Sequence, residues 1–109
     1  MSPAYVAQTH FDPAVLQQLD APIERLCADS RRVQPGDTFV AYPGEVQDGR
    51  AHIGAALAAG AASVLWESQG FEWDPAWRVP NLGIAGLRGV VGEIAGHVYG
   101  HPSRALWVI

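Results

Sequence analysis

The sequence has 109 residues, 49% of them hydrophobic, which suits one domain with one core. Its net charge of −4 argues against a surface for nucleic acid or an anionic membrane, because both need a basic face. The single cysteine, Cys27, excludes an internal disulfide and a cysteine-based metal cluster. No run of about 18 or more apolar residues predicts a membrane span, and no signal-peptide pattern opens the chain, so we expect a cytoplasmic protein.

The first part of the chain predicts one short helix and two short strands. A helix over 13–19 follows a capping Asp and begins with Pro, which suits the first helical position. Residues 25–28 predict a strand that ends in the polar turn 29–31, and residues 38–42 predict a largely apolar strand. Ligands usually bind at strand ends in α/β domains, so the polar turns beside these strands are candidate sites.

The middle of the chain alternates helix and strand. Asp48 caps a helix with an apolar stripe, and a strand over 61–66 follows it after a short loop. This order implies parallel pairing with a right-handed crossover. Residues 77–84 predict a weak edge strand, which either spans Pro80 or begins at Asn81.

The clearest helical pattern covers residues 87–98, where apolar side chains recur at i, i+3, i+4 and i+7. Its opposite face carries four glycines, for which close approach of a neighbouring element and chance are equal explanations: Gly86, Gly89, Gly92 and Gly96. Residues 105–109 begin another strand, inside which the sequence stops, so we expect a piece of a longer protein. Together the elements predict an α/β fold, a small layered domain with a mixed, partly parallel sheet flanked by helices.

The residues alone show no catalytic apparatus and no metal site. Ser30 lies in a turn without the G-x-S-x-G frame that exposes a nucleophile. The glycines of the last helix lack the Lys-Ser/Thr tail of a phosphate loop, and no two histidines form an H-x-x-x-H pair on one helix. What remains is a candidate ligand-binding edge formed by Ser30 and residues 44–48.

Several short motifs stand in a fixed order: Asp29-Ser30-Arg31, Val33-x-Pro35-Gly36-Asp37-x-Phe39-Val40-Ala41, Asp48-Gly49-Arg50 and Gly60-Ala61-Ala62. This series, which covers nearly the whole chain from about residue 12, resembles the N-terminal domain of the Mur ligases of peptidoglycan synthesis. Ser30, Arg50 and the run from Tyr99 to Ser103 favour the members that add diaminopimelate or lysine. The sister ligases that add D-alanyl-D-alanine usually carry Asp-Thr-Arg and Asp-Gly-His in these places.

The resemblance implies that residues 1–109 form a single N-terminal domain, which binds the UDP end of UDP-N-acetylmuramoyl-L-alanyl-D-glutamate. The positions that match the family's substrate contacts are Ala28, Ser30, Glu45, Val46 and Gln47, with Arg31, Gly44 and Asp48 as further candidates. A diphosphate would suit the helix start after Asp48. Glu45 stands where the family loop often carries His, and its charge would oppose a nearby diphosphate.

The resemblance also implies that the chemistry lies outside this chain, in a central ATP-binding domain and a C-terminal amino-acid domain. ATP and Mg would serve the full-length enzyme in activating the D-glutamate carboxylate, and this chain would bind no cofactor and carry no catalytic residue. The expected partners are the UDP-N-acetylmuramoyl-dipeptide and the protein's own two further domains. The alternatives are the D-alanyl-D-alanine-adding ligase and a non-enzymatic α/β interaction module; the added amino acid stays open between meso-diaminopimelate, which we favour, and lysine.

Overall fold

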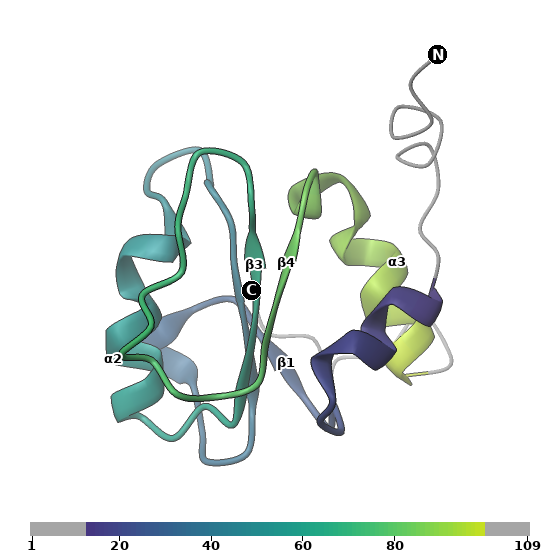
Figure 1. Cartoon of the computed structure of the whole chain (residues 1–109), viewed down its shortest axis with the longest axis horizontal. Coiled ribbons are helices and arrows are strands. Elements are labelled where there is room, and N and C mark those ends of the chain that lie inside the picture. Colours follow the sequence, from purple (N-terminus) through teal and green to yellow (C-terminus); the bar gives the residue numbers. More distant parts are fainter. Residues whose placement is uncertain (1–12, 100–109) are drawn as a thin grey trace.

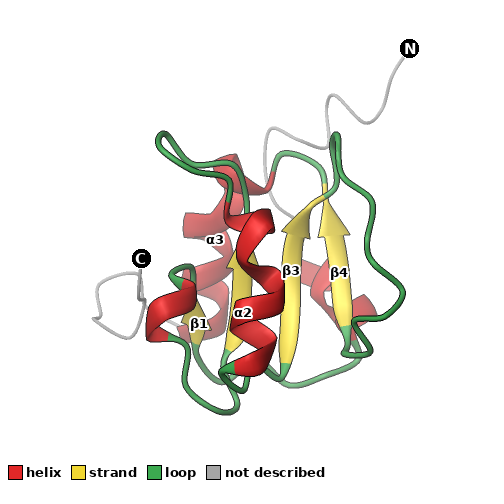
Figure 2. Ribbon diagram, turned by 90° about the vertical axis from the view of Figure 1, so that its left-hand side faces the viewer, coloured by secondary structure: helices red, strands yellow, loops and turns green. Residues whose placement is uncertain are grey.

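A computed structural model describes residues 13–99, in which a parallel sheet is covered by helices on both faces (Figure 1). The four strands follow one another across the sheet in chain order: β1 (Leu26–Cys27), β2 (Thr38–Ala41), β3 (Ser63–Glu67) and β4 (Asn81–Ile84). Two helices lie on one face, the 3-10 helix η1 (Pro13–Leu19) and α3 (Leu87–Tyr99). The short helix α2 (Ile53–Ala58) covers the other face, as Figure 2 shows from its side.

The predicted α/β class is confirmed, and the sheet differs from the prediction in one respect. All three strand pairings among residues 13–99 are parallel, whereas the sequence predicted a mixed sheet. Each connection crosses over a face of the sheet and returns to the same end, which is what parallel pairing requires. The strand predicted over 105–109 lies outside the described residues.

The element boundaries settle one point that the sequence left open and refine another. The edge strand β4 begins at Asn81, directly after Pro80, because proline cannot donate a ladder hydrogen bond. The helix that Asp48 caps begins as a separate 3-10 turn, η3 (Gly49–His52), before α2.

Side chains of the strands alternate between two apolar cores. Leu26, Val40 and Leu65 pack with η1 and α3 on one face. Cys27, Phe39 and Val64 pack with α2 on the other face. This two-sided burial explains why the second predicted strand is apolar at nearly every position.

The long connection from β3 to β4 carries aromatic side chains onto the α2 side of the sheet. Trp66 on β3 packs against Phe71 and Trp73, with ring centroids 5.8 and 5.6 Å away. Trp73 in turn packs edge-on against Trp77, at 5.1 Å, and donates a hydrogen bond from its indole N–H to the Trp77 carbonyl. The aromatic rings therefore cover this part of the sheet in place of a helix.

The glycines of α3 have no packing explanation within the described residues. A side chain at Gly89, Gly92 or Gly96 would meet nothing within 4 Å. Close approach of a neighbouring element among residues 13–99 is therefore not their cause.

Gly60, which ends the turn after α2, has a clear structural role. Its φ is +109°, and a Cβ atom there would lie 2.8 Å from Cα of Pro35. The carbonyl of Gly60 also accepts a 3.0 Å hydrogen bond from the Gly36 N–H. Only glycine fits a left-handed conformation at such close contact.

We expect Gly60→Ala to lower the free energy of unfolding by about 1–3 kcal/mol, because it adds backbone strain and a clash with Pro35. Gly70→Ala is the matched control, since Gly70 also has a positive φ, of +73°, but open space around it. Denaturant unfolding followed by circular dichroism measures both. Equal losses in the two variants would contradict the role of the Pro35 contact.

Candidate functional site

A pocket of about 460 Å³ opens at the carboxyl ends of β1 and β2, the end of the sheet to which the strand arrows of Figure 2 point. It is lined by Ala28, Asp29, Ser30, Arg31, Phe39, Val40, Tyr42, Gly44, Gln47, Gly49 and His52. In parallel α/β sheets this edge is where ligands bind.

The first wall of the pocket is the turn that follows β1. Asp29 caps the 3-10 helix η2 (Ser30–Arg32), and its Oδ1 accepts a 2.9 Å hydrogen bond from the Arg31 N–H. The Arg31 guanidinium pairs with both carboxylate oxygens at 3.0 Å, and this contact lowers the pKa of Asp29. The Ser30 hydroxyl makes no hydrogen bond to another described residue, so it is available to a ligand.

A half-buried ion pair between Arg25 and Asp37 supports this wall. Arg25 donates two hydrogen bonds to Asp37, at 2.8 and 3.0 Å, and a third to the Arg32 carbonyl at 3.1 Å. Asp37 also accepts a 2.8 Å bond from the Gln34 N–H. Burial opposes ionisation of Asp37, but the bonds from Arg25 and Gln34 outweigh it and lower the pKa of the carboxyl.

The second wall is a hairpin formed by residues 43–49. Pro43 and Asp48 form an antiparallel bridge, and the Gly44 N–H donates to the Gln47 carbonyl at 2.8 Å. Gly49 closes the hairpin by donating to the Tyr42 carbonyl at 3.0 Å. This closure places Gln47 at the pocket and Glu45 and Val46 at the tip of the hairpin.

The structure brings together five of the predicted site residues and separates three. Ala28, Ser30, Arg31, Gly44 and Gln47 line the pocket. Glu45, Val46 and Asp48 do not line it, and their contact with a ligand stays a prediction.

Each of these three residues has a different environment. Val46 is 92% exposed at the hairpin tip. The Glu45 carboxylate lies 3.3 Å from the Arg88 guanidinium on α3. The Asp48 carboxylate is held by Arg50.

The lining includes residues that the sequence did not single out as substrate contacts, although Asp29 belongs to the candidate turn 29–31: Asp29, Phe39, Val40, Tyr42, Gly49 and His52. Phe39 and Val40 belong to an apolar strand, and nothing in the sequence distinguishes them from core residues. Tyr42 ends that predicted strand, so the rule that ligands bind at strand ends predicts it. His52 lies one helical turn after Asp48, and only the folded hairpin places it beside Gln47.

Asp48 and Arg50 repeat the geometry of Asp29 and Arg31, but here the arginine is buried. Asp48 Oδ1 accepts from the Arg50 N–H at 2.9 Å, and the guanidinium Nη2 lies 2.8 Å from Oδ2. Arg50, only 9% exposed, also donates from Nη1 to the carbonyls of Glu67 and Gln69, at 3.0 and 2.7 Å. The guanidinium lowers the pKa of Asp48. Arg50 thus ties the base of the hairpin to the end of β3.

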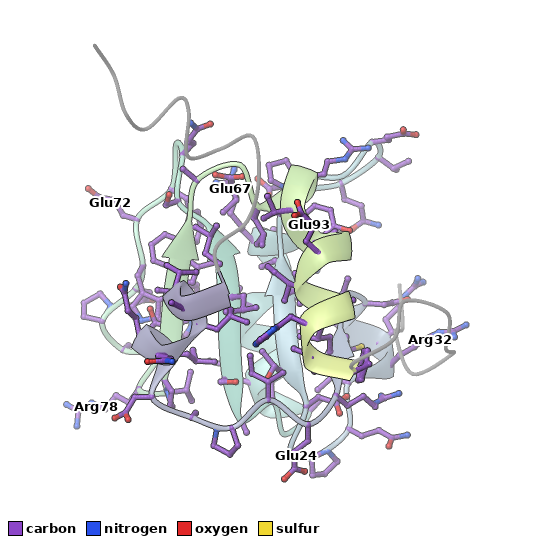
Figure 3. The ribbon with its side chains drawn as sticks, turned by 90° about the vertical axis from the view of Figure 1, so that its right-hand side faces the viewer. Glu24, Arg32, Glu67, Glu72, Arg78 and Glu93 are labelled. Atoms are coloured by element: carbon purple, nitrogen blue, oxygen red, sulfur yellow. The ribbon has the colours of Figure 1, made fainter. Side chains whose placement is uncertain are left out.

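The start of α3 is fixed at the same place. The Glu67 carboxylate accepts hydrogen bonds from the Gly86 and Leu87 N–H groups, at 3.0 and 2.9 Å. Figure 3 shows Glu67 beside the first turn of α3. The end of β3 therefore carries both the hairpin base, through Arg50, and the start of α3.

The N–H groups at the start of η3 already have partners. Gly49 donates to the Tyr42 carbonyl, Arg50 to the Asp48 side chain, and Ala51 to the Asp48 carbonyl. A diphosphate bound at this helix start would have to open one of these bonds.

Among residues 13–99, no group of three or more His, Cys, Asp or Glu side chains has the arrangement to hold a metal ion. Within the same residues, no helix combines the length and apolar character that a membrane crossing requires.

The fold and the pocket define a small α/β domain with a cavity at the carboxyl ends of its parallel strands. Residues 22–99 match the family model described as "Mur ligase family, catalytic domain", and the chain belongs to the Mur ligase family.

The chain is also similar to individual proteins. It is 53% identical to the UDP-N-acetylmuramoyl-L-alanyl-D-glutamate–2,6-diaminopimelate ligase of Nitrosomonas europaea over 87% of the chain and 18% of that protein. The identity is also 53% to the ligase of the same name from Chromobacterium violaceum, over 100% of the chain and 22% of that protein. Among solved structures, the MurF ligase from Thermotoga maritima in complex with ADP matches with a TM-score of 0.55 and 26% identity, over 71% of this chain and 17% of that one. The chain thus spans about a fifth of the length of these curated relatives.

We expect Arg50→Met to lower the free energy of unfolding by roughly 1.5–3 kcal/mol, because it removes hydrogen bonds from a buried charged group. Arg31→Met is the control. Arg31 makes the same contact with the Asp two residues earlier, but the Arg31 side chain is 84% exposed. We expect that variant to keep the wild-type melting temperature. Thermal unfolding measures the stability of both variants. Equal losses would contradict the stabilising role of the buried Arg50 contacts.

The lowered pKa of Asp37 predicts a specific acid response. A folded pKa below the unfolded value, about 3.9 for Asp, stabilises the fold above that value; the contribution is lost as pH falls through the folded pKa. Asp37→Asn should therefore lower stability at pH 7 and flatten the decline below about pH 4. Urea unfolding between pH 7 and pH 2 measures this, with the exposed Glu72→Gln as control. Superimposable stability-against-pH curves for the wild type and Asp37→Asn would disprove the contribution of the Asp37 carboxylate.

Proposed function

We propose that this chain is the UDP-binding N-terminal domain of an ATP-dependent peptide ligase of peptidoglycan synthesis. Its pocket binds the UDP end of UDP-N-acetylmuramoyl-L-alanyl-D-glutamate. The observation that carries the proposal is the pocket at the ends of β1 and β2, where Ser30 and Gln47 line one cavity. The names of the relatives from Nitrosomonas europaea and Chromobacterium violaceum support this substrate.

The lining suits a pyrimidine nucleoside. Uracil presents alternating hydrogen-bond donors and acceptors, which the Ser30 hydroxyl and the backbone at Ala28 can satisfy. Tyr42 is partly exposed in the lining and can supply an apolar surface for the ring, whereas the side chains of Phe39 and Val40 are buried in the two cores. The base is therefore proposed to lie against the first wall.

The charges near the pocket are compatible with a diphosphate. Arg31 provides a guanidinium in the lining, although Asp29 already pairs with it. Glu45, whose charge would oppose a diphosphate, pairs with Arg88 and lies outside the lining. The hairpin can therefore approach an anionic ligand without placing this carboxylate against it.

The ligation itself is proposed to occur in other domains of the parent protein. All seven basic residues of this chain are Arg, so it has no lysine for a phosphate loop. We assign ATP and Mg to a central domain and the incoming amino acid to a C-terminal domain. This domain's part is to hold the nucleotide, so that binding energy far from the reacting carboxylate positions it.

We propose meso-diaminopimelate as the added amino acid, because the relatives at 53% identity carry it in their names. The names of these two relatives give no support to the D-alanyl-D-alanine-adding alternative. The parent ligase is proposed to be cytoplasmic, where ATP and UDP-linked precursors are available.

An amide NMR titration of the chain with UDP, uridine and ADP tests the pocket. We expect shifts at residues 28–31 and 42–52, weaker with ADP, and a roughly three- to tenfold loss of UDP affinity in Ser30→Ala, because one hydrogen bond is removed. Ser68→Ala, outside the pocket, should bind as the wild type does. Absence of shifts at millimolar UDP, in the chain and in the full-length parent, would favour the non-enzymatic interaction module instead.

A further inference from the structure

Two polar side chains meet on the hairpin side of the pocket. His52 Nε2 lies 2.6 Å from Gln47 Oε1, and both residues line the cavity. Gln47 comes from the hairpin and His52 from η3, so the bond joins two segments of the second wall. The other ring nitrogen, Nδ1 of His52, has no hydrogen-bond partner among residues 13–99.

The other charged groups of the lining are already paired. Asp29 and Arg31 bind each other on the opposite wall. Asp48, which lies near His52 in sequence, has its carboxylate engaged by Arg50. Among the described residues of the lining, Nδ1 of His52 is therefore a ring nitrogen without a partner, and the Arg31 guanidinium, which keeps only Nη1 unbonded, is already paired with Asp29.

The Gln47 amide can hold the imidazole in either tautomer. Its carbonyl oxygen accepts from Nε2–H, which leaves Nδ1 as an acceptor. After a half-turn of the amide, its NH₂ group donates to Nε2, and the proton then resides on Nδ1. In the second state Nδ1–H is a donor with no partner in the described protein, in a pocket that lacks a free cation.

We propose that His52 donates from Nδ1–H to a phosphate oxygen of the bound nucleoside diphosphate, and that Gln47 selects this tautomer. The inference rests on the proposed function and assigns the diphosphate to the hairpin wall. An imidazole N–H donor suits an anionic phosphate oxygen, which accepts only, whereas Ser30 and the backbone on the other wall suit uracil, which presents both donors and acceptors. His52 is then a substrate-binding residue, and Gln47 positions it.

Three variants of His52 separate the two ring nitrogens. His52→Asn keeps an N–H donor near the place of Nδ1, His52→Gln keeps one near the place of Nε2, and His52→Phe keeps the ring without a donor. Each is titrated with UDP and with uridine by NMR. We expect the ratio of UDP to uridine affinity to fall about tenfold in the Phe and Gln variants and to stay near wild type in Asn. Uridine affinity should be the same in all of them.

The outcomes distinguish this inference from the proposed function. Failure of both the wild-type chain and the full-length parent to bind UDP or uridine would overturn both. Wild-type chain that binds UDP, with a ratio unchanged in His52→Phe, would overturn only the role of His52. Loss of uridine binding in the His52 variants would also overturn it, because the residue would then support the pocket and not the phosphate.

The imidazole ¹⁵N spectrum of His52 tests the role of Gln47. Addition of UDP should move Nδ1 from the unprotonated to the protonated range, and Gln47→Met, which removes the amide, should reduce that change. A spectrum in which UDP leaves both ring nitrogens unmoved would contradict the proposed contact.

Discussion

The pocket depends on the parallel pairing of β1 with β2. Leu26 and Cys27 on β1 pair with Thr38 and Phe39 on β2, so the two chains leave the sheet side by side at the same edge. The turn after β1 and the hairpin after β2 then line the same pocket. An antiparallel pair would have sent these segments to opposite ends of the sheet.

The same Asp-x-Arg turn serves both walls, and burial decides what each one does. In both turns the carboxylate caps a 3-10 helix and binds the arginine two residues later. Arg31 remains exposed, so its pair with Asp29 shapes only the local turn. Arg50 is enclosed by the end of β3 and by the Phe71 ring, 5.1 Å from its guanidinium, so its pair joins separate parts of the fold. Two turns of similar sequence thus contribute differently to the fold: one is local, and the other joins distant segments.

Local patterns in the sequence predicted the order of elements and the strand ends, and therefore Ser30 and Gln47. They did not predict that the sheet is parallel throughout the described residues, because pairing direction depends on contacts far apart in the chain. The sequence did not predict that His52 lines the pocket for the same reason, since its bond to Gln47 exists only after the hairpin closes. Conversely, Val46 matched a family position but is placed at the tip by that closure.

The hairpin is held at two points of very different strength. Its base is joined to the end of β3 through the buried Arg50, and its tip contacts α3 through the exposed Glu45–Arg88 pair. Dissolved ions screen an exposed pair and scarcely affect a buried one. Rising ionic strength should therefore weaken the contact of the tip with α3, while the base of the hairpin stays joined to β3.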